Sequence, residues 1–154
     1  MKIILTAIAP RRVRSKTEAA DRLFDEYVDR ASRYMPCEAQ SFETEAAFLD
    51  WVDRQDRHPG RTPAFVELLD SLGQMVTSEE FAGHIGRLRD DGLQRVVVGI
   101  GPADGWSKAT HKRSNLLISL GRVTLPHTLA RVVLAEQVYR ALTILAGHPY
   151  HSGH

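Results

Sequence analysis

The sequence predicts an α/β fold in which a mainly parallel sheet is flanked by helices. From end to end, short apolar runs alternate with longer segments whose apolar residues recur every three or four positions. The short runs are apolar throughout, as in strands buried on both faces. With 154 residues and 43% apolar composition, the chain suits a single domain, which we expect to span residues 1–154.

The first half of the chain contains two predicted strand and helix pairs. We expect a strand at 2–9, an amphipathic helix at 17–34, a weaker strand at 38–42 and a helix at 43–55. Pro10 closes the first strand, and Pro59 with Gly60 breaks the chain after the second helix. The opening apolar run is too short for a membrane span and its arginines follow it, the reverse of a signal peptide.

The second half continues the alternation. We expect a strand at 64–69, a helix from Ser78 to about Gly92, a strand at 94–100, a strand at 116–120 and a long helix from about Leu129 to Gly147. Ser78 is placed to cap its helix, and Pro126 favours a helix start just after it. Ligands of open parallel sheets bind beyond the carboxyl ends of the strands, so the loops at 69–73, 99–105 and 120–127 are the candidate binding loops.

Glycines gather in the second of these loops, at Gly99, Gly101 and Gly105. Two interpretations are open. Without side chains, the backbone can approach a flat or charged ligand closely, or the glycines only make a tight turn from strand to helix.

The last predicted helix carries charges on an apolar stripe. Glu136 and Arg140 share this stripe with Val132 and Val133, and their spacing allows them to pair with each other. Otherwise they need a partner, such as a dimer interface or a substrate. His127 falls near the positive end of the helix, where a neutral imidazole is favoured, and a capping role is the alternative.

A proline, a tyrosine and two histidines follow the helix, in the sequence HPYH at 148–151. This combination suits base stacking and proton handling on RNA. A disordered chain end is the alternative.

Charge and cysteine content exclude several classes of protein. A net charge of +1 creates no global attraction for nucleic acid, so RNA affinity must come from local clusters. The dense basic clusters are Arg11, Arg12, Arg14 and Lys16, and Lys108, His111, Lys112 and Arg113, unless both are ordinary solvated surface. A lone cysteine, Cys37, forms no intrachain disulfide, which suits the cytoplasm, and it rules out a cysteine-rich metal site. Without a GxSxG motif, a serine hydrolase of that type is also excluded.

Four ordered motifs resemble one family. They are TLPH at 124–127, RVVL at 131–134, EQVYRA at 136–141 and HPYH at 148–151. Together they are similar to the RlmH family of bacterial methyltransferases, which act on pseudouridine N3 of large-subunit ribosomal RNA. Further matches are MKI at the start, Leu69 and Asp70 with Gly73 and Ser78, and Gly101 with Pro102 after the valine-rich strand.

The resemblance implies a SPOUT methyltransferase fold whose C-terminal part, about 99–151, forms a trefoil knot. It also implies a homodimer with active sites completed across the interface, the methyl donor S-adenosylmethionine, no metal, and 23S ribosomal RNA within the ribosome as substrate. Donor contacts then fall on Leu69, Gly101, Leu120, Gly121, Arg122, Val123, Thr124 and Leu125. The expected catalytic residues are His151 and Tyr150 at the base and Arg140 or Arg131 near developing charge or phosphate, while His127 shapes the donor loop.

Three segments depart from the family pattern. The family usually has GGPEG after the valine-rich strand, where this chain has IGPADG at 100–105, and Gly-Lys after the first strand, where this chain has Ala9 and Pro10. It also tends to have a basic residue after the final histidine, where this chain has Ser152. The alternative function is therefore a catalytically degenerate homodimer that binds RNA or ribosomes.

Overall fold

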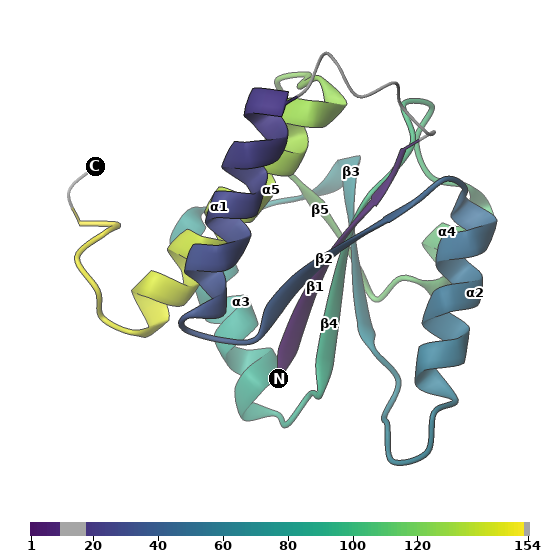
Figure 1. Cartoon of the computed structure of the whole chain (residues 1–154), viewed down its shortest axis with the longest axis horizontal. Coiled ribbons are helices and arrows are strands. Elements are labelled where there is room, and N and C mark those ends of the chain that lie inside the picture. The colour runs from purple at the N-terminus through teal and green to yellow at the C-terminus, as the bar shows by residue number, and fades with distance from the viewer. Residues whose placement is uncertain (10–17, 153–154) are drawn as a thin grey trace.

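The protein is a three-layer α/β structure. The computed structural model describes residues 1–9 and 18–152. Its strands form one five-stranded sheet in the order β2-β1-β4-β3-β5, and every neighbouring pair is parallel. Helices cover both faces of the sheet, with α1, α3 and α5 on one side and α2 and α4 on the other (Figure 1). The predicted fold class is confirmed.

The predicted alternation of strands and helices is present. The elements are β1 (Lys2–Ile8), α1 (Glu18–Ser32), β2 (Cys37–Phe42), α2 (Glu45–Asp56), β3 (Phe65–Met75), α3 (Ser78–Asp90), β4 (Arg95–Ile100), α4 (Lys108–Arg113), β5 (Leu116–Ser119) and α5 (His127–Leu145). Every residue of β4 is buried, as expected of a central strand covered on both faces.

Two apolar clusters hold the layers together, one on each face of the sheet. The larger joins α1, α3 and α5 to the sheet, and includes Ile3, Phe24, Ile85 and Val138. The smaller joins α2 to the opposite face through Phe48 and Val52, among others. Burial of these side chains is the main driving force for the fold.

The predicted loop at 69–73 is wrong, because β3 continues through it to Met75. Both Leu69 and Gln74 lie opposite Ile118 of β5, so the intervening residues form a bulge. At Gly73 the strands approach so closely that an added Cβ would lie 2.6 Å from the backbone carbonyl carbon of Ile118. Patterns of apolar residues do not report such a close approach between strands.

Two further local predictions need correction. The cap of α3 is Thr77 and not Ser78. The Thr77 hydroxyl accepts from the backbone N–H of Glu80, and the Glu80 carboxylate accepts from the backbone N–H of Thr77. The short helix α4 was not predicted, because its six residues have no apolar periodicity. Its start is capped by the hydroxyl of Ser107.

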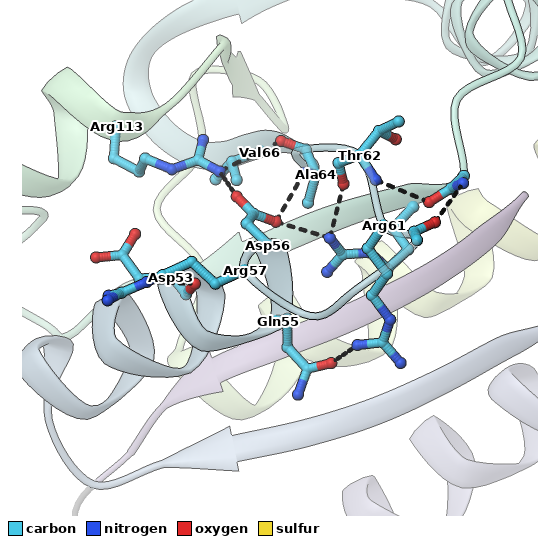
Figure 2. Close-up of polar contacts among 12 residues, drawn as sticks. Asp53, Gln55, Asp56, Arg57, Arg61, Thr62, Ala64, Val66 and Arg113 are labelled. Atoms are coloured by element: carbon cyan, nitrogen blue, oxygen red, sulfur yellow. Dashed lines mark hydrogen bonds and ion pairs between the residues drawn. The ribbon is translucent and has the colours of Figure 1, made fainter.

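Asp56, the last residue of α2, joins three segments at the amino-terminal edge of the sheet (Figure 2). One carboxylate oxygen accepts from the Ala64 backbone N–H at 2.9 Å and from Arg95 at 2.7 Å, and the other accepts from Arg113 at 2.6 Å. Burial acts to raise the pKa of the Asp56 carboxyl, but these hydrogen bonds outweigh it and lower the pKa below its usual value. Arg95 is only 7% exposed, so it depends on Asp56 for compensation of its charge.

The described residues contain neither a candidate membrane-spanning helix nor a candidate metal-holding cluster. Among residues 1–9 and 18–152, no helix has the length and apolar character of a membrane span. Over the same ranges, no group of three or more histidine, cysteine or acidic side chains is arranged to hold a metal ion. The predicted basic cluster Arg11, Arg12, Arg14 and Lys16 lies outside the described residues.

Candidate functional site

A pocket of about 570 Å³ lies at the carboxyl ends of β4 and β5 and at the start of the β3 bulge. This is the edge at which open parallel sheets bind ligands, and the volume is within the usual range for small-molecule sites. The residues expected to contact the methyl donor all line it: Leu69, Gly101, Leu120, Gly121, Arg122, Val123, Thr124 and Leu125.

The loop after β5 forms one wall of this pocket. Gly121 has a φ of 114°, a conformation that favours glycine. The Ser119 hydroxyl stabilises this turn, since it donates to the Gly121 carbonyl at 3.0 Å and accepts from the Gly121 N–H at 3.2 Å. The Arg122 side chain is largely exposed, although the residue lines the pocket.

Two of the three glycines at 99–105 have a role that neither interpretation anticipated. An added Cβ would lie 3.1 Å from the Trp106 ring at Gly99 and 2.8 Å from it at Gly101. These two glycines therefore make room for an indole ring. Gly105 alone among the three has a positive φ, 85°, and it fits the tight-turn interpretation.

Asp70 and Trp106 also line the pocket, and the sequence analysis assigned a role to neither. The Asp70 carboxylate accepts from the Leu72 backbone N–H at 2.8 Å and lies 2.8 Å from Nε2 of His111. Both contacts, that of Leu72 first, lower the pKa of Asp70, so it stays ionised at neutral pH. The sequence signal that could have identified Asp70 is its position directly after Leu69, a predicted donor contact.

His127 lines the pocket from the first turn of α5. The cap position belongs to Pro126, which makes no side-chain cap, so His127 is the first helical residue and not the cap. This agrees with its predicted place at the positive end of the helix.

A second group of polar residues lies at the other end of α5. We call it the C-terminal cluster, and it consists of Glu79, Glu136, Arg140, Tyr150 and His151. Nη2 of Arg140 donates to Oε1 of Glu136 at 2.6 Å, so the two charges of the apolar stripe pair with each other. The Tyr150 hydroxyl donates to the same oxygen at 3.1 Å, and Arg140 lies 4.8 Å from the Tyr150 ring centroid.

These contacts order the tail and set the ionisation of its groups. For residues 148–152, a disordered chain end is wrong, because the Tyr150 ring packs 4.6 Å from that of Tyr139. Burial, together with hydrogen bonds to Tyr27 and Glu136, raises the pKa of Tyr150 far above its usual value. Tyr150 therefore stays protonated and acts as a hydrogen-bond donor.

The contacts of His151 define which of its nitrogens carries the proton. Nδ1 lies 3.2 Å from Nη1 of Arg140, and Nε2 lies 2.8 Å from Oε1 of Glu79. A guanidinium only donates, so Nδ1 accepts and Nε2–H donates to Glu79. The hydrogen bond from His151 is the main reason that the pKa of Glu79 lies below its usual value. Glu79 is a member of the site that the sequence analysis missed.

The pocket and the C-terminal cluster involve different stretches of α5. His127 and Arg140 are separated by thirteen positions on one helix, or about 20 Å at 1.5 Å per residue. Arg131 lies between them, faces α1, pairs with Asp21 at 3.3 Å and stacks 4.5 Å from the Phe24 ring centroid. One chain therefore brings the predicted donor contacts together in the pocket, and it brings Arg140, Tyr150 and His151 together in the C-terminal cluster. Arg131, the fourth predicted catalytic residue, lies apart from that cluster.

The second predicted basic cluster lies on and beside α4, and carboxylates hold two of its members. Arg113 pairs with Asp56 at 2.6 Å, and His111 contacts Asp70 at 2.8 Å. Lys108 and Lys112 are exposed. This cluster therefore offers fewer free positive charges for binding phosphates than its sequence indicated.

Comparison with known proteins identifies relatives along nearly the whole chain. Residues 1–151 match a family model described as "Predicted SPOUT methyltransferase". A ribosomal RNA large subunit methyltransferase H from Koribacter versatilis is 48% identical over 141 residues, which cover 92% of this chain and 94% of that protein. A protein of the same name from Brucella anthropi is 54% identical over 84 residues, covering 54% of this chain and 52% of its own length.

Solved structures with a similar fold include the SpoU methyltransferase AviRb from Streptomyces viridochromogenes. Its complex with AdoMet has a TM-score of 0.50 and 13% identity, and covers 95% of this chain and 58% of AviRb. A structure described without AdoMet has a TM-score of 0.52 and covers 96% and 61%. At this identity the similarity concerns the fold alone.

Proposed function

This chain belongs to the SPOUT methyltransferases, in the family of the ribosomal RNA large subunit methyltransferases H, and we propose that it methylates N3 of a pseudouridine in 23S ribosomal RNA. It is an S-adenosylmethionine-dependent enzyme that acts on ribosomal RNA. The proposal also includes the target nucleotide, the assembled ribosome as substrate, a cytoplasmic location, a single domain, the knot and the homodimer.

The observation that carries the proposal is the pocket at the carboxyl ends of β4 and β5 and the start of the β3 bulge. Its volume of about 570 Å³ suits a ligand of the size of S-adenosylmethionine, and the predicted donor contacts come from all three of these places. We assign binding of the donor to Leu69, Gly101 and the loop 120–125. When bound, the donor supplies a methyl group bonded to a positively charged sulfur, and the ionised Asp70 carboxylate at the pocket wall favours such a cation.

The C-terminal cluster supports the second half of the proposal, which concerns the base. Methylation of an imide nitrogen requires removal of its proton and alignment of the nitrogen with the methyl group. We assign proton acceptance to Nδ1 of His151, whose Nε2–H is oriented by Glu79. The substrate must then displace the contact between Arg140 and Nδ1, which leaves the Arg140 guanidinium close to the developing negative charge. Tyr150, as a neutral donor with an aromatic ring, is assigned to base stacking.

The separation of about 20 Å between His127, which lines the pocket, and Arg140 of the C-terminal cluster supports a homodimer in which each site uses both chains. Apolar side chains beside the pocket point to the same conclusion. Leu72 is 91% exposed in the bulge of β3, and Val123 is 78% exposed in the loop after β5. A second chain that covered these side chains would remove apolar surface from water, which stabilises a dimer.

Two measurements test the function. Calorimetry is expected to show that S-adenosylmethionine binds to the wild-type protein. A methylation assay is expected to show donor-dependent methylation of ribosomes that contain the target pseudouridine. Ribosomes that carry uridine at this position are expected to react poorly or not at all. Binding of ribosomes without any binding of the donor would instead support the degenerate binding protein.

A pair of histidine variants tests the assignment of roles. His151→Ala is expected to lower kcat by about 10²- to 10⁴-fold, the range for loss of general acid–base catalysis, with little change in donor affinity. His127→Ala is expected to weaken donor binding and to raise KM for the donor, because His127 lines the pocket. If His127→Ala abolished methylation at saturating donor while His151→Ala kept full activity, the two roles would be reversed.

Mixed dimers test whether the site is shared. Thr124→Trp, at an exposed position of the pocket wall, is designed to block the pocket, and His151→Ala removes the proton acceptor. Each variant alone is expected to be inactive. After the two are unfolded and refolded together, about a quarter of the wild-type activity should return, because half of the dimers then hold one complete site of two. No recovery in verified mixed dimers would show that each site is built from one chain.

A further inference from the structure

Trp106 is a buried aromatic residue at the end of the loop after β4. Its side chain is 8% exposed and packs against Phe48 of α2, with ring centroids 5.7 Å apart. The residue also lines the pocket. It therefore connects the apolar core beneath the sheet to the wall of the pocket.

The indole N–H of Trp106 has a specific partner. Nε1 donates to the backbone carbonyl of Leu69 at 2.9 Å. Leu69 is the last residue of β3 before the bulge, and it lies opposite both Ile100 and Ile118. The indole thus bonds to the carbonyl at the point where the regular sheet ends and the pocket begins.

The surroundings of Trp106 hold its ring in one place. Gly99 and Gly101 leave room for the ring, since Cβ atoms there would lie 3.1 Å and 2.8 Å from it. The following residues are held from α2, where Glu45 accepts from the Ser107 backbone N–H at 2.9 Å and from the Thr110 hydroxyl at 2.7 Å. Burial acts to raise the pKa of Glu45, but these bonds lower it below its usual value, so Glu45 is ionised at neutral pH.

We propose that Trp106 is a positioning residue for the methyl donor, which holds the Leu69 carbonyl and the glycine-rich loop in the geometry that binds S-adenosylmethionine. This inference rests on the proposed function of the pocket. Without the indole N–H, the Leu69 carbonyl loses this hydrogen bond at a partly buried position, and the chain is expected to move to satisfy it. The wall of the pocket moves with it.

Trp106→Phe tests the proposal, because phenylalanine keeps an aromatic ring but has no N–H. The Kd for S-adenosylmethionine is expected to rise about tenfold, which corresponds to about 1.4 kcal/mol. KM for the donor should rise similarly, with kcat changed less than about twofold at saturating donor, since uniform binding is lost. The matched control is Trp51→Phe, at a residue of α2 that is 9% exposed and does not line the pocket. It is expected to keep the wild-type Kd.

The control variant also provides a test that does not require Trp106→Phe to fold. The sequence has two tryptophans, so Trp51→Phe leaves Trp106 as the sole indole fluorophore. Its emission is expected to change on titration with S-adenosylmethionine, with the midpoint at the calorimetric Kd. An unchanged emission, or a wild-type Kd in Trp106→Phe, would overturn the positioning role of Trp106 but not the proposed function of the pocket. Failure of the wild-type protein to bind the donor would overturn the proposed function as well.

Discussion

Gly73→Ala is expected to destabilise the protein by about 3 kcal/mol or more, or to prevent its folding. An alanine Cβ at this position would lie 2.6 Å from one backbone atom of Ile118 and 2.7 Å from atoms of Ile118 and Leu117. These are main-chain atoms of β5, so relief requires separation of two paired strands. In thermal unfolding, a loss of 3 kcal/mol lowers Tm by roughly 6–12 °C for a chain of this size.

Gly83→Ala is the matched control for this prediction. Gly83 lies in α3, where an added Cβ meets only the end of the Arg87 side chain, at an ordinary 3.5 Å. Because alanine is a better helix former than glycine, this variant is expected to be more stable by up to about 1 kcal/mol. A Gly73→Ala protein with wild-type Tm would show that β3 and β5 do not approach as closely as described.

Asp56→Asn is expected to cost about 3–5 kcal/mol, the usual range when one partner of a buried ion pair is removed. The change removes the charge that compensates both Arg95 and Arg113, and places an amide where a carboxylate accepts hydrogen bonds. Within residues 1–9 and 18–152, the buried Nε and Nη1 atoms of Arg95 have no hydrogen-bond partner, so this guanidinium has little other compensation there. The measurement is the free energy of unfolding in urea at neutral pH.

The pH dependence of this effect follows from the lowered pKa of Asp56. Its folded pKa lies below the ordinary value of 3.8, so its contribution is fully present above that value and is lost as pH falls through the folded pKa. The difference between wild type and Asp56→Asn should therefore be constant near neutral pH and shrink in acid. Asp53→Asn, an exposed acid of the same helix, should change stability by less than about 0.5 kcal/mol. A difference between wild type and Asp56→Asn that grows in acid would contradict the assignment.

Features that depend on residues close in sequence could be predicted from the sequence. The strands β1 and β4 are continuous apolar runs, and α1 has a clear amphipathic period, so each was found within a few residues of its ends. The pairing of Glu136 with Arg140 is one of the two alternatives that the sequence leaves open, because four positions form about one turn of a helix. The helix α4 was not predicted, because its six residues are too few to show an apolar periodicity.

Features that depend on contacts between distant segments could not be predicted. Trp106 bonds to a carbonyl 37 positions away, and His151 contacts Glu79 over 72 positions. The need for glycine at Gly101 comes from the Trp106 ring, although a glycine in a loop after a strand also fits a ligand contact or a turn. A sequence pattern records which side chains are absent, but not what fills the space.

The sequence by itself determined the parallel α/β fold, the family and the segments that end at the pocket, because periodicity and ordered motifs are local properties of the chain. Tertiary structure alone decided how the candidate site divides between a pocket that includes His127 and a C-terminal cluster that includes Arg140, about 20 Å further along α5. It also decided which tautomer His151 adopts and which carbonyl accepts from the Trp106 indole. The physical reason is that hydrogen bonds and close packing depend on distances in space, which the spacing of residues along the chain does not determine.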